Sequence, residues 1–168
     1  MSKTPFILAI ESSCDDTAAA VLQGSHVLSN CIANQEIHKQ YGGVVPELAS
    51  RAHQSKIVPV IHQALRQANI DKKQIGAIAY TQGPGLLGSL LVGGAFAKSL
   101  AMAWQIPLLE IDHMQGHLLV HFIKEVHLSP PEFPFIGVTL SGGHTQLVWV
   151  EDYFKMTVLG TTLDDAIG

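Results

Sequence analysis

Apolar residues near the start of the chain form three short runs separated by polar loops. The runs extend from Phe6 to Glu11, from Thr17 to Leu22 and from His26 to Ala33. The polar residues Ser12 to Asp16 separate the first two runs, and Gln23 to Ser25 have the composition of a tight turn. Runs of this length bounded by turn residues are typical of β-strands. We therefore expect three antiparallel strands, with a Ser- and Asp-rich loop in the first hairpin.

Helical spacing replaces this pattern in the next part of the chain. Pro46 suits the first turn of a helix, where its missing N–H costs nothing. From Leu48 to Leu65, apolar positions recur at intervals of three and four residues, which predicts a helix. Pro59 falls inside this stretch, and because proline removes a backbone donor we expect a kink or a break there.

Two apolar runs and a long apolar segment follow. Ile75 to Thr81 and Ile106 to Ile111 are predicted to be strands, and a helix is predicted from about Leu86 to Trp104. This helix is nearly long enough to cross a bilayer, but it contains Lys98 and several glycines. We expect it to belong to a folded core and not to a membrane. A last helix is predicted from Asp112, as its cap, to Val126.

The residues after the prolines at 130, 131 and 134 repeat the opening pattern. A strand from Phe135 to Leu140 precedes a loop of small residues, and strands from His144 to Glu151 and from Met156 to Thr162 follow. The order βββαβαβα is that of the ribonuclease-H-like unit, from which actin-like (ASKHA) ATPases are built in duplicate. We therefore predict an α/β actin-like ATPase fold, with a first subdomain at residues 1–130 and the start of a second at residues 131–168.

His113 and His117 are the clearest candidates for metal ligands. In a helix they lie one turn apart on one face, and neutral imidazoles so placed can hold a single iron or zinc ion. His121 extends the row, but at about 12 Å from His113 it cannot share that ion. Spaced histidines on a helix also occur without any metal. Two ligands do not complete a site, so a third would have to come from elsewhere.

Composition limits the class of protein. A chain of 168 residues with 47% hydrophobic and 14% charged residues can form a compact core, and it does not have the composition of a disordered protein. The net charge of −4 argues against binding nucleic acid by electrostatics alone. Cys14 and Cys31 form no disulfide framework, and we expect a reducing cytoplasm and no secretion signal. Leu163 to Gly168 look like the start of a helix, so we expect the N-terminal portion of a longer protein.

Five stretches together are similar to one family, the TsaD family of tRNA N6-adenosine threonylcarbamoyltransferases, formerly called glycoproteases or O-sialoglycoprotein endopeptidases. The chain resembles the N-terminal half of that family. The five stretches are Ile10–Thr17, Tyr41–Arg51, Gly83–Leu86, His113–His117 and Ser141–Leu147.

This resemblance implies a metal-assisted reaction that transfers a threonylcarbamoyl group from threonylcarbamoyl-AMP to N6 of adenosine 37, in tRNAs reading codons that begin with A. His113 and His117 match the family's ligands for Fe²⁺ or Zn²⁺, whose third ligand is an aspartate in the C-terminal half. Gln115 stands where many members have Glu, which puts in doubt any acid–base role for that position. The substrate-binding loop of the family matches Thr139, Leu140, Ser141, Gly142 and Gly143. The first loop matches less closely at Ser13, Asp15 and Asp16.

The resemblance also implies partners. TsaB would dock on the helices near Pro46 to Leu65 and Leu86 to Trp104, and TsaE, tRNA and ATP or ADP would join the complex in the cytoplasm. We expect the isolated chain to be inactive, and its self-association is left open. Two alternatives remain, a non-catalytic TsaB-like binding partner and an ASKHA-type phosphotransferase. Proteolysis is disfavoured because Met114 occupies the place of the glutamate base in HExxH.

Overall fold

The computed structural model describes residues 4–124, 129–164 and 166 of the chain. Contacts divide it into two compact units, Met1–His113 and Met114–Gly168. The division lies between His113 and Met114. The repeated sequence pattern predicts a later subdomain boundary, at residue 130. That boundary stays a prediction.

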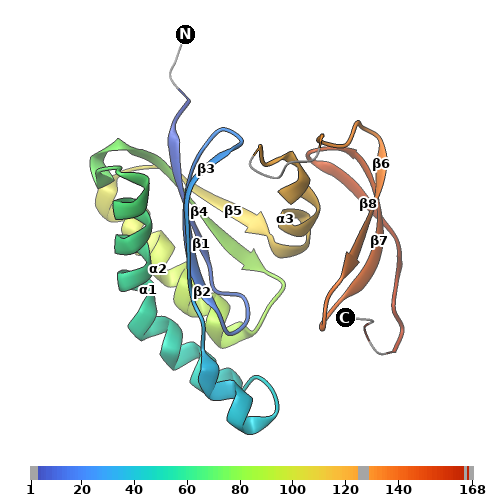
Figure 1. Cartoon of the computed structure of the whole chain (residues 1–168), viewed down its shortest axis with the longest axis horizontal. Helices are drawn as coiled ribbons and strands as arrows, with labels where there is room; N and C mark the ends of the chain where they lie inside the picture. Colours follow the sequence, from blue (N-terminus) through green and yellow to red (C-terminus); the bar gives the residue numbers. More distant parts are fainter. Residues whose placement is uncertain (1–3, 125–128, 165, 167–168) are drawn as a thin grey trace. The chain divides into compact units, whose positions relative to one another are not determined.

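The first unit is a mixed five-stranded sheet in the order β3-β2-β1-β4-β5. Its first three strands are antiparallel, and β4 and β5 run parallel to β1. Helices α1 and α2 cover the same face of this sheet (Figure 1). The element bounds are β1 Phe6–Glu11, β2 Thr17–Gln23, β3 His26–Ala33, η1 Glu36–Tyr41, α1 Pro46–Ala68, η2 Lys72–Gln74, β4 Ile75–Gly83, α2 Leu87–Trp104 and β5 Leu108–Asp112.

The hydrophobic core of the first unit lies between the sheet and the two helices. Leu8, Val21 and Ile78 at its centre are fully buried, and Ile57 from α1 and Ala97 from α2 pack in the same cluster. The strands alternate buried and part-buried positions, as expected for a sheet with one covered face. The packing therefore follows from the apolar periodicity of the sequence.

Small residues let α2 lie close to its neighbours. A Cβ atom added at Gly93 would overlap the Ser12 hydroxyl, and one added at Gly88 would overlap the Ser50 hydroxyl on α1. By length and apolar composition alone this helix could cross a membrane, and 28% of its residues are buried inside the protein. Helices that pack in the core of globular domains can have the same length and composition, and the contacts at Gly88 and Gly93 show close packing against the rest of the first unit.

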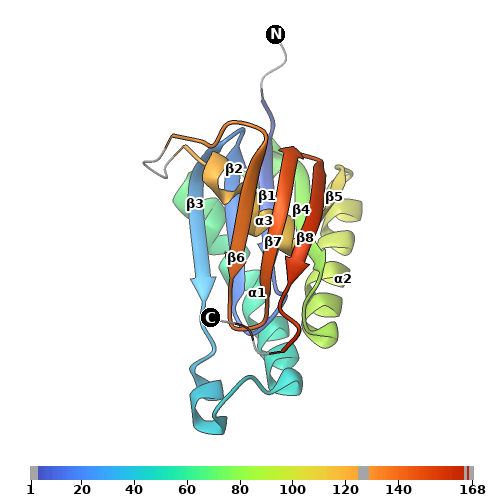
Figure 2. The ribbon, with the colours of Figure 1, turned by 90° about the vertical axis from the view of Figure 1, so that its right-hand side faces the viewer.

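The second unit is a three-stranded antiparallel sheet in the order β6-β7-β8, which Figure 2 shows as neighbouring strands. A short helix packs against it through Leu118, which contacts the cluster around Val148 and Val150. Phe122 stacks on Phe133 at 5.1 Å between ring centroids. The element bounds are α3 His113–Leu119, η3 Val120–Phe122, β6 Phe135–Leu140, β7 Thr145–Asp152 and β8 Lys155–Thr161.

The structure confirms the predicted βββαβαβα order and the second set of three strands. It differs in two places. The break expected at Pro59 is absent, and α1 continues from Pro46 to Ala68. Pro59 and Ser55 are both exposed, so water can hydrate the carbonyl that loses its helical partner.

The predicted histidine helix is also too long. Asp112 is the last residue of β5, and α3 ends at Leu119 and passes into the 3₁₀ turn η3. Phe122 in that turn is drawn into the aromatic cluster with Phe133 and Tyr153. The predicted end at Val126 lies outside the described residues.

Candidate functional site

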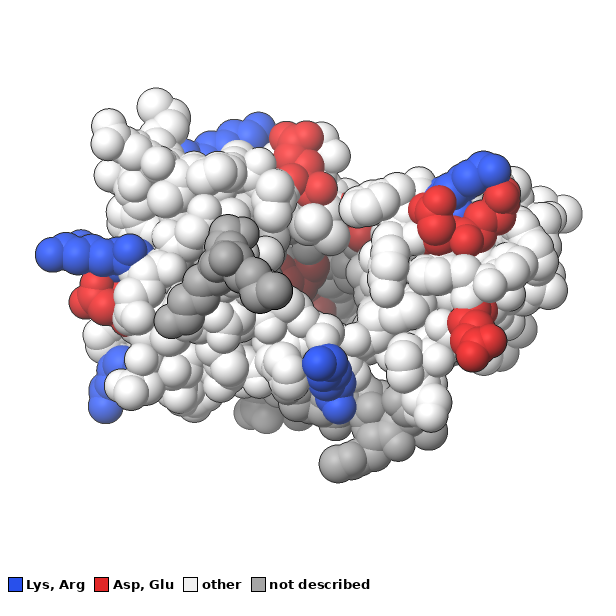
Figure 3. All heavy atoms as spheres, turned by 90° about the horizontal axis from the view of Figure 1, so that it is seen from above, with Lys and Arg blue, Asp and Glu red and all other residues white. Residues whose placement is uncertain are grey.

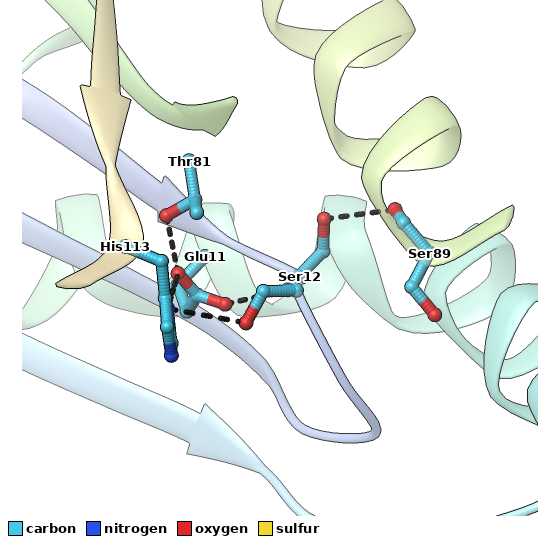
Figure 4. A network of polar contacts seen from close by, with 6 residues as sticks. Glu11, Ser12, Thr81, Ser89 and His113 are labelled. Atoms are coloured by element: carbon cyan, nitrogen blue, oxygen red, sulfur yellow. Dashed lines mark hydrogen bonds and ion pairs between the residues drawn. The ribbon is translucent and has the colours of Figure 1, made fainter. Parts of the chain in front are cut away.

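Glu11 is the centre of a polar cluster at the carboxyl end of β1. Its neighbour β4 runs parallel, so the two strands end at the same edge of the sheet. The Thr81 hydroxyl of β4 donates a hydrogen bond to one carboxylate oxygen of Glu11, and the backbone N–H of Ser13 donates to the other at 2.5 Å. Figure 4 shows Thr81 and His113 both directed at this carboxylate.

Burial alone would raise the pKa of Glu11, because it disfavours the charged form. Hydrogen bonds from Ser13 and Thr81, together with the nearby His113, oppose this effect and leave the pKa below its ordinary value. Glu11 is therefore an ionised acceptor at neutral pH. It can orient the donors around it and does not act as a proton donor there.

His113 is oriented by this cluster. Its Nδ1 atom lies 3.3 Å from the Ser13 hydroxyl oxygen and 3.6 Å from a carboxylate oxygen of Glu11. With Nδ1 donating to these oxygens, the tautomer of the ring carries its lone pair on Nε2. Outer contacts of this kind fix ring orientation in metal-binding histidines. The arrangement suits a ligand that coordinates through Nε2.

His113 and His117 are the first and fifth residues of α3, so they lie one helical turn apart. His113 is part-buried and His117 is exposed, while His121 lies beyond α3 in η3. Across residues 4–124, 129–164 and 166, no cluster of three His, Cys, Asp or Glu side chains is placed to hold a metal. The two imidazoles fit as two ligands of a metal site, and their assignment stays a prediction.

The first-hairpin loop carries Ser13, Asp15 and Asp16. Ser13 is buried and contacts Glu11 and His113, Asp15 is part-buried, and Asp16 is exposed. Partial burial and the neighbouring Asp15 raise the pKa of the Cys14 thiol in the same loop. Cys14 is therefore held as a thiol near neutral pH and is a poor candidate for a nucleophile.

The second hairpin joins β6 and β7 through Ser141 to His144. The Ser141 N–H and hydroxyl both donate to the His144 carbonyl, at 2.9 and 3.0 Å, and the His144 N–H donates back to the Ser141 hydroxyl oxygen at 3.0 Å. A Cβ atom added at Gly143 would meet nothing within 4 Å, so the turn is open there. A compact turn with an open glycine is suited to binding an anion through backbone N–H groups.

Thr139 precedes this turn and has an unusual environment. Its side chain is 7% exposed, and within the described residues its hydroxyl has no hydrogen-bond partner. Buried hydroxyls are nearly always paired, so an unpaired one indicates a group that a ligand or water satisfies. The predicted loop residues Thr139, Leu140, Ser141, Gly142 and Gly143 are thus continuous along the end of β6 and its turn.

Within the second unit, His117 lies on a helix that packs against β6. Leu118 of α3 packs on Gly137, where a Cβ atom would overlap its side chain. His117 and His121 line a hollow of about 350 Å³ together with residues of β6. Within this unit, therefore, the helix that carries His117 lies against the strand that leads to the Ser141 turn.

Sequence reasoning missed Glu11 and Thr81. Each stands at the end of a strand that is otherwise apolar, and Glu11 is the first charged residue after a run of five apolar ones. In parallel sheets, polar side chains at the carboxyl ends of adjacent strands meet at one edge. That rule could have placed both of them next to the first loop.

The family model for tRNA N6-adenosine threonylcarbamoyltransferase, TsaD, matches residues 26–168. The enzyme of that name from Christiangramia forsetii is 68% identical over 162 residues, which are 96% of this chain and 48% of the relative. The one from Riemerella anatipestifer is 59% identical over 166 residues, 99% of this chain and 49% of the relative. The chain thus spans about half the length of these relatives.

Among solved structures, YeaZ from Pseudomonas aeruginosa is similar, with a TM-score of 0.59 at 15% sequence identity. The match covers 92% of this chain and 66% of YeaZ. At this identity the likeness concerns the fold alone, and it confirms the predicted α/β actin-like ATPase fold.

Proposed function

Because the chain belongs to the TsaD family, we propose that it provides the N-terminal half of a tRNA N6-adenosine threonylcarbamoyltransferase. In the proposed reaction, N6 of adenosine 37 attacks the carbamoyl carbon of threonylcarbamoyl-AMP. The new C–N bond replaces the bond from that carbon to the phosphate oxygen, AMP leaves, and N6 gives up one proton. The 68% identity with a relative of this activity, over nearly the whole chain, supports this proposal.

The metal-assisted part of the proposal depends on one observation. Nδ1 of His113 contacts Ser13 and Glu11, and the same helix carries His117 one turn later. His113 and His117 would hold Fe²⁺ or Zn²⁺, for which imidazole is a suitable ligand. Such an ion supplies Lewis-acid polarisation of a carbonyl oxygen.

The chain's own side chains have separate tasks. Glu11 and Ser13 keep the His113 ring in one orientation, so that the ligand is in place before any substrate arrives. The open turn at Gly142 and Gly143 would receive the adenylate phosphate through its backbone N–H groups, since the Ser141 N–H is bonded to His144. Ser141 shapes this turn through its bonds to His144 and is not itself assigned a chemical step.

The proposed complex contains TsaB, TsaE and tRNA, with ATP or ADP as a further ligand, and we place it in the cytoplasm. Apolar side chains on the outer faces of the two helices support docking of a TsaB-type partner, since Leu87, Leu91 and Met102 of α2 and Val58 of α1 are more than half exposed. Lys and Arg stand singly or in small groups on the face drawn in Figure 3. With a net charge of −4, tRNA binding is therefore proposed to depend on partners.

Two other functions fit the fold, a non-catalytic binding partner and a phosphotransferase. The likeness to YeaZ at 15% identity favours neither, because it concerns the fold alone. The transferase is preferred because the chain is 68% identical to a relative of that name over 96% of its length.

A chimeric enzyme tests the proposal. Residues 1–168 of this chain are joined to the C-terminal half of the Christiangramia forsetii relative, which supplies the remainder of a full-length protein. The chimera is assayed with TsaB, TsaE, ATP, threonine, bicarbonate, the enzyme that makes threonylcarbamoyl-AMP, and an A37-containing tRNA. Mass spectrometry of the tRNA nucleosides measures the modified adenosine.

The proposal expects modified adenosine with the chimera and none with residues 1–168 alone. The chimera carrying His117→Ala serves as the matched control and should lose the modification. A folded chimera that forms the complex but leaves adenosine 37 unmodified would contradict the proposal. Full modification by the isolated chain would contradict the view that it is half of the catalyst.

A further inference from the structure

His53 is a fully buried histidine on α1 whose two ring nitrogens are both hydrogen bonded. Nε2 lies 3.0 Å from the carbonyl oxygen of Cys14, in the first-hairpin loop. Nδ1 lies 2.8 Å from the hydroxyl oxygen of Thr17, at the start of β2. Because a carbonyl oxygen only accepts, Nε2 donates to Cys14, and in the neutral ring Nδ1 accepts from Thr17.

Ser89 on α2 reaches the same carbonyl from another direction. It is fully buried, and its hydroxyl donates to the Cys14 oxygen at 2.8 Å. The Ser12 hydroxyl donates to the Ser89 carbonyl at 3.0 Å, and the Leu86 N–H donates to the Ser13 carbonyl at 2.7 Å. Figure 4 shows the Ser12 hydroxyl directed at the backbone carbonyl of Ser89.

Three successive loop residues are therefore fixed by two helices. Hairpin loops generally lie on the surface and move more than the strands that they join. Here the Cys14 carbonyl accepts two hydrogen bonds from buried side chains, and each of those side chains would be left unpaired if the loop moved. An unpaired buried polar group destabilises the conformation that contains it, so movement of the loop is opposed.

We propose that His53 and Ser89 are positioning residues, which hold the first-hairpin loop so that Ser13, Asp15 and Asp16 meet the acyl-adenylate in a fixed arrangement. The identity of that ligand rests on the proposed function. The anchoring itself depends only on contacts within the first unit. His53 and Ser89 act through the Cys14 carbonyl and do not touch the ligand.

Two substitutions at position 53 separate the two hydrogen bonds of the ring. His53→Gln places an amide N–H close to the position of Nε2 and can still donate to Cys14. The shorter His53→Asn places its amide near Nδ1 and can reach only Thr17. Ser89→Ala removes the second donor without changing His53. Ser29→Ala is the matched control, because the Ser29 hydroxyl makes a buried 2.8 Å bond to Ala64 on the same helix without contacting the loop.

Amide hydrogen exchange of the 168-residue chain and its variants provides the first readout. In His53→Asn and Ser89→Ala, the amides of residues 12–17 should exchange about tenfold faster or more, the equivalent of one lost buried bond. His53→Gln loses the bond to Thr17 and keeps the one to Cys14, so exchange of residues 12–15 should stay within about twofold of the parent chain. Ser29→Ala should lower global stability and leave the loop's local exchange unchanged.

The second readout is the KM for threonylcarbamoyl-AMP in the chimera described above. His53→Asn should raise this KM with little change in kcat, and His53→Gln should restore it. Equal loop exchange in His53→Asn and the parent chain, or no difference between Asn and Gln, would overturn the anchoring. Faster loop exchange without any change in KM would overturn the positioning role. An inactive parent chimera would count against the proposed function, while the exchange data still decide the anchoring.

Discussion

The Thr81 hydroxyl donates a hydrogen bond to the Glu11 carboxylate across the ends of the parallel strands β4 and β1. The same carboxylate accepts the Ser13 N–H and lies 3.6 Å from Nδ1 of His113. One acidic side chain therefore links a strand end, the first-hairpin loop and the first residue of α3. Its role is to hold donors in place, because its pKa is lowered and it is ionised at neutral pH.

Glu11→Gln should destabilise the protein. The amide would turn an N–H toward a donor, either Thr81 or Ser13, where the carboxylate accepts at both oxygens. We expect a loss of about 1–3 kcal/mol in the free energy of unfolding. Urea denaturation at pH 7 measures it.

The matched control for this change is Glu110→Gln, since Glu110 is exposed and its described hydrogen bond is the one that it accepts from Tyr80. The glutamine oxygen can still accept that bond, and position 110 is exposed, so we expect a change within about 0.5 kcal/mol. Equal losses in the two variants would show that Glu11 is not the centre of the cluster.

Gly85→Ala should displace the first-hairpin loop. A Cβ atom at position 85 would lie 2.5 Å from the Ser13 carbonyl oxygen, which is backbone and also accepts the Leu86 N–H. The clash should lower the free energy of unfolding by about 1–3 kcal/mol. Gly43→Ala is the comparison, because a Cβ there would meet nothing within 4 Å. Thermal unfolding of both variants tests this prediction. Equal Tm values for Gly85→Ala and Gly43→Ala would refute the close approach at Gly85.

Tyr80 should make stability depend on alkaline pH. Burial and the hydrogen bond to Glu110 raise the pKa of Tyr80 above its ordinary value of 10.0. A raised pKa in the folded state gives a contribution that is fully present below pH 10 and is lost as pH rises toward the folded-state pKa. Tyr80→Phe should therefore flatten the fall in stability above pH 10. Urea midpoints measured from pH 8 to 11 that fall equally in both proteins would contradict this.

The order of strands and helices along the chain and the repeated βββ pattern could be predicted from the sequence, because short apolar runs bounded by turn residues are typical of strands and helical spacing of apolar residues is typical of helices. The extent of α3 could not. Local spacing continued to Val126, but packing of Phe122 with Phe133 and Tyr153 ends the regular helix at Leu119. The continuity of α1 through Pro59 was missed for a similar reason, since exposure on the outer face makes the lost hydrogen bond tolerable.

The sequence motifs of the candidate site could be predicted, but the contacts between residues distant in sequence could not. The histidine pair and the Ser141 turn are contiguous motifs, and their roles stay predictions. Glu11, His53 and Ser89 were not identified as site residues from the sequence. Each one has a hydrogen-bond partner that is distant in sequence. His53 meets Cys14 across 39 positions, and Ser89 meets it across 75. Such contacts follow from the fold of the sheet and helices and not from local sequence.

Zinc binding by the chimera that contains residues 1–168 tests the central claim that α3 holds a divalent metal through His113 and His117, because the expected third ligand belongs to the C-terminal half. Equilibrium dialysis with elemental analysis is performed on the parent chimera and on its His113→Ala, His117→Ala and His121→Ala variants. We predict one zinc per parent chimera, affinity lowered about tenfold or more in the first two variants, and no change in the third. Parent-like zinc binding in both His113→Ala and His117→Ala would contradict the account.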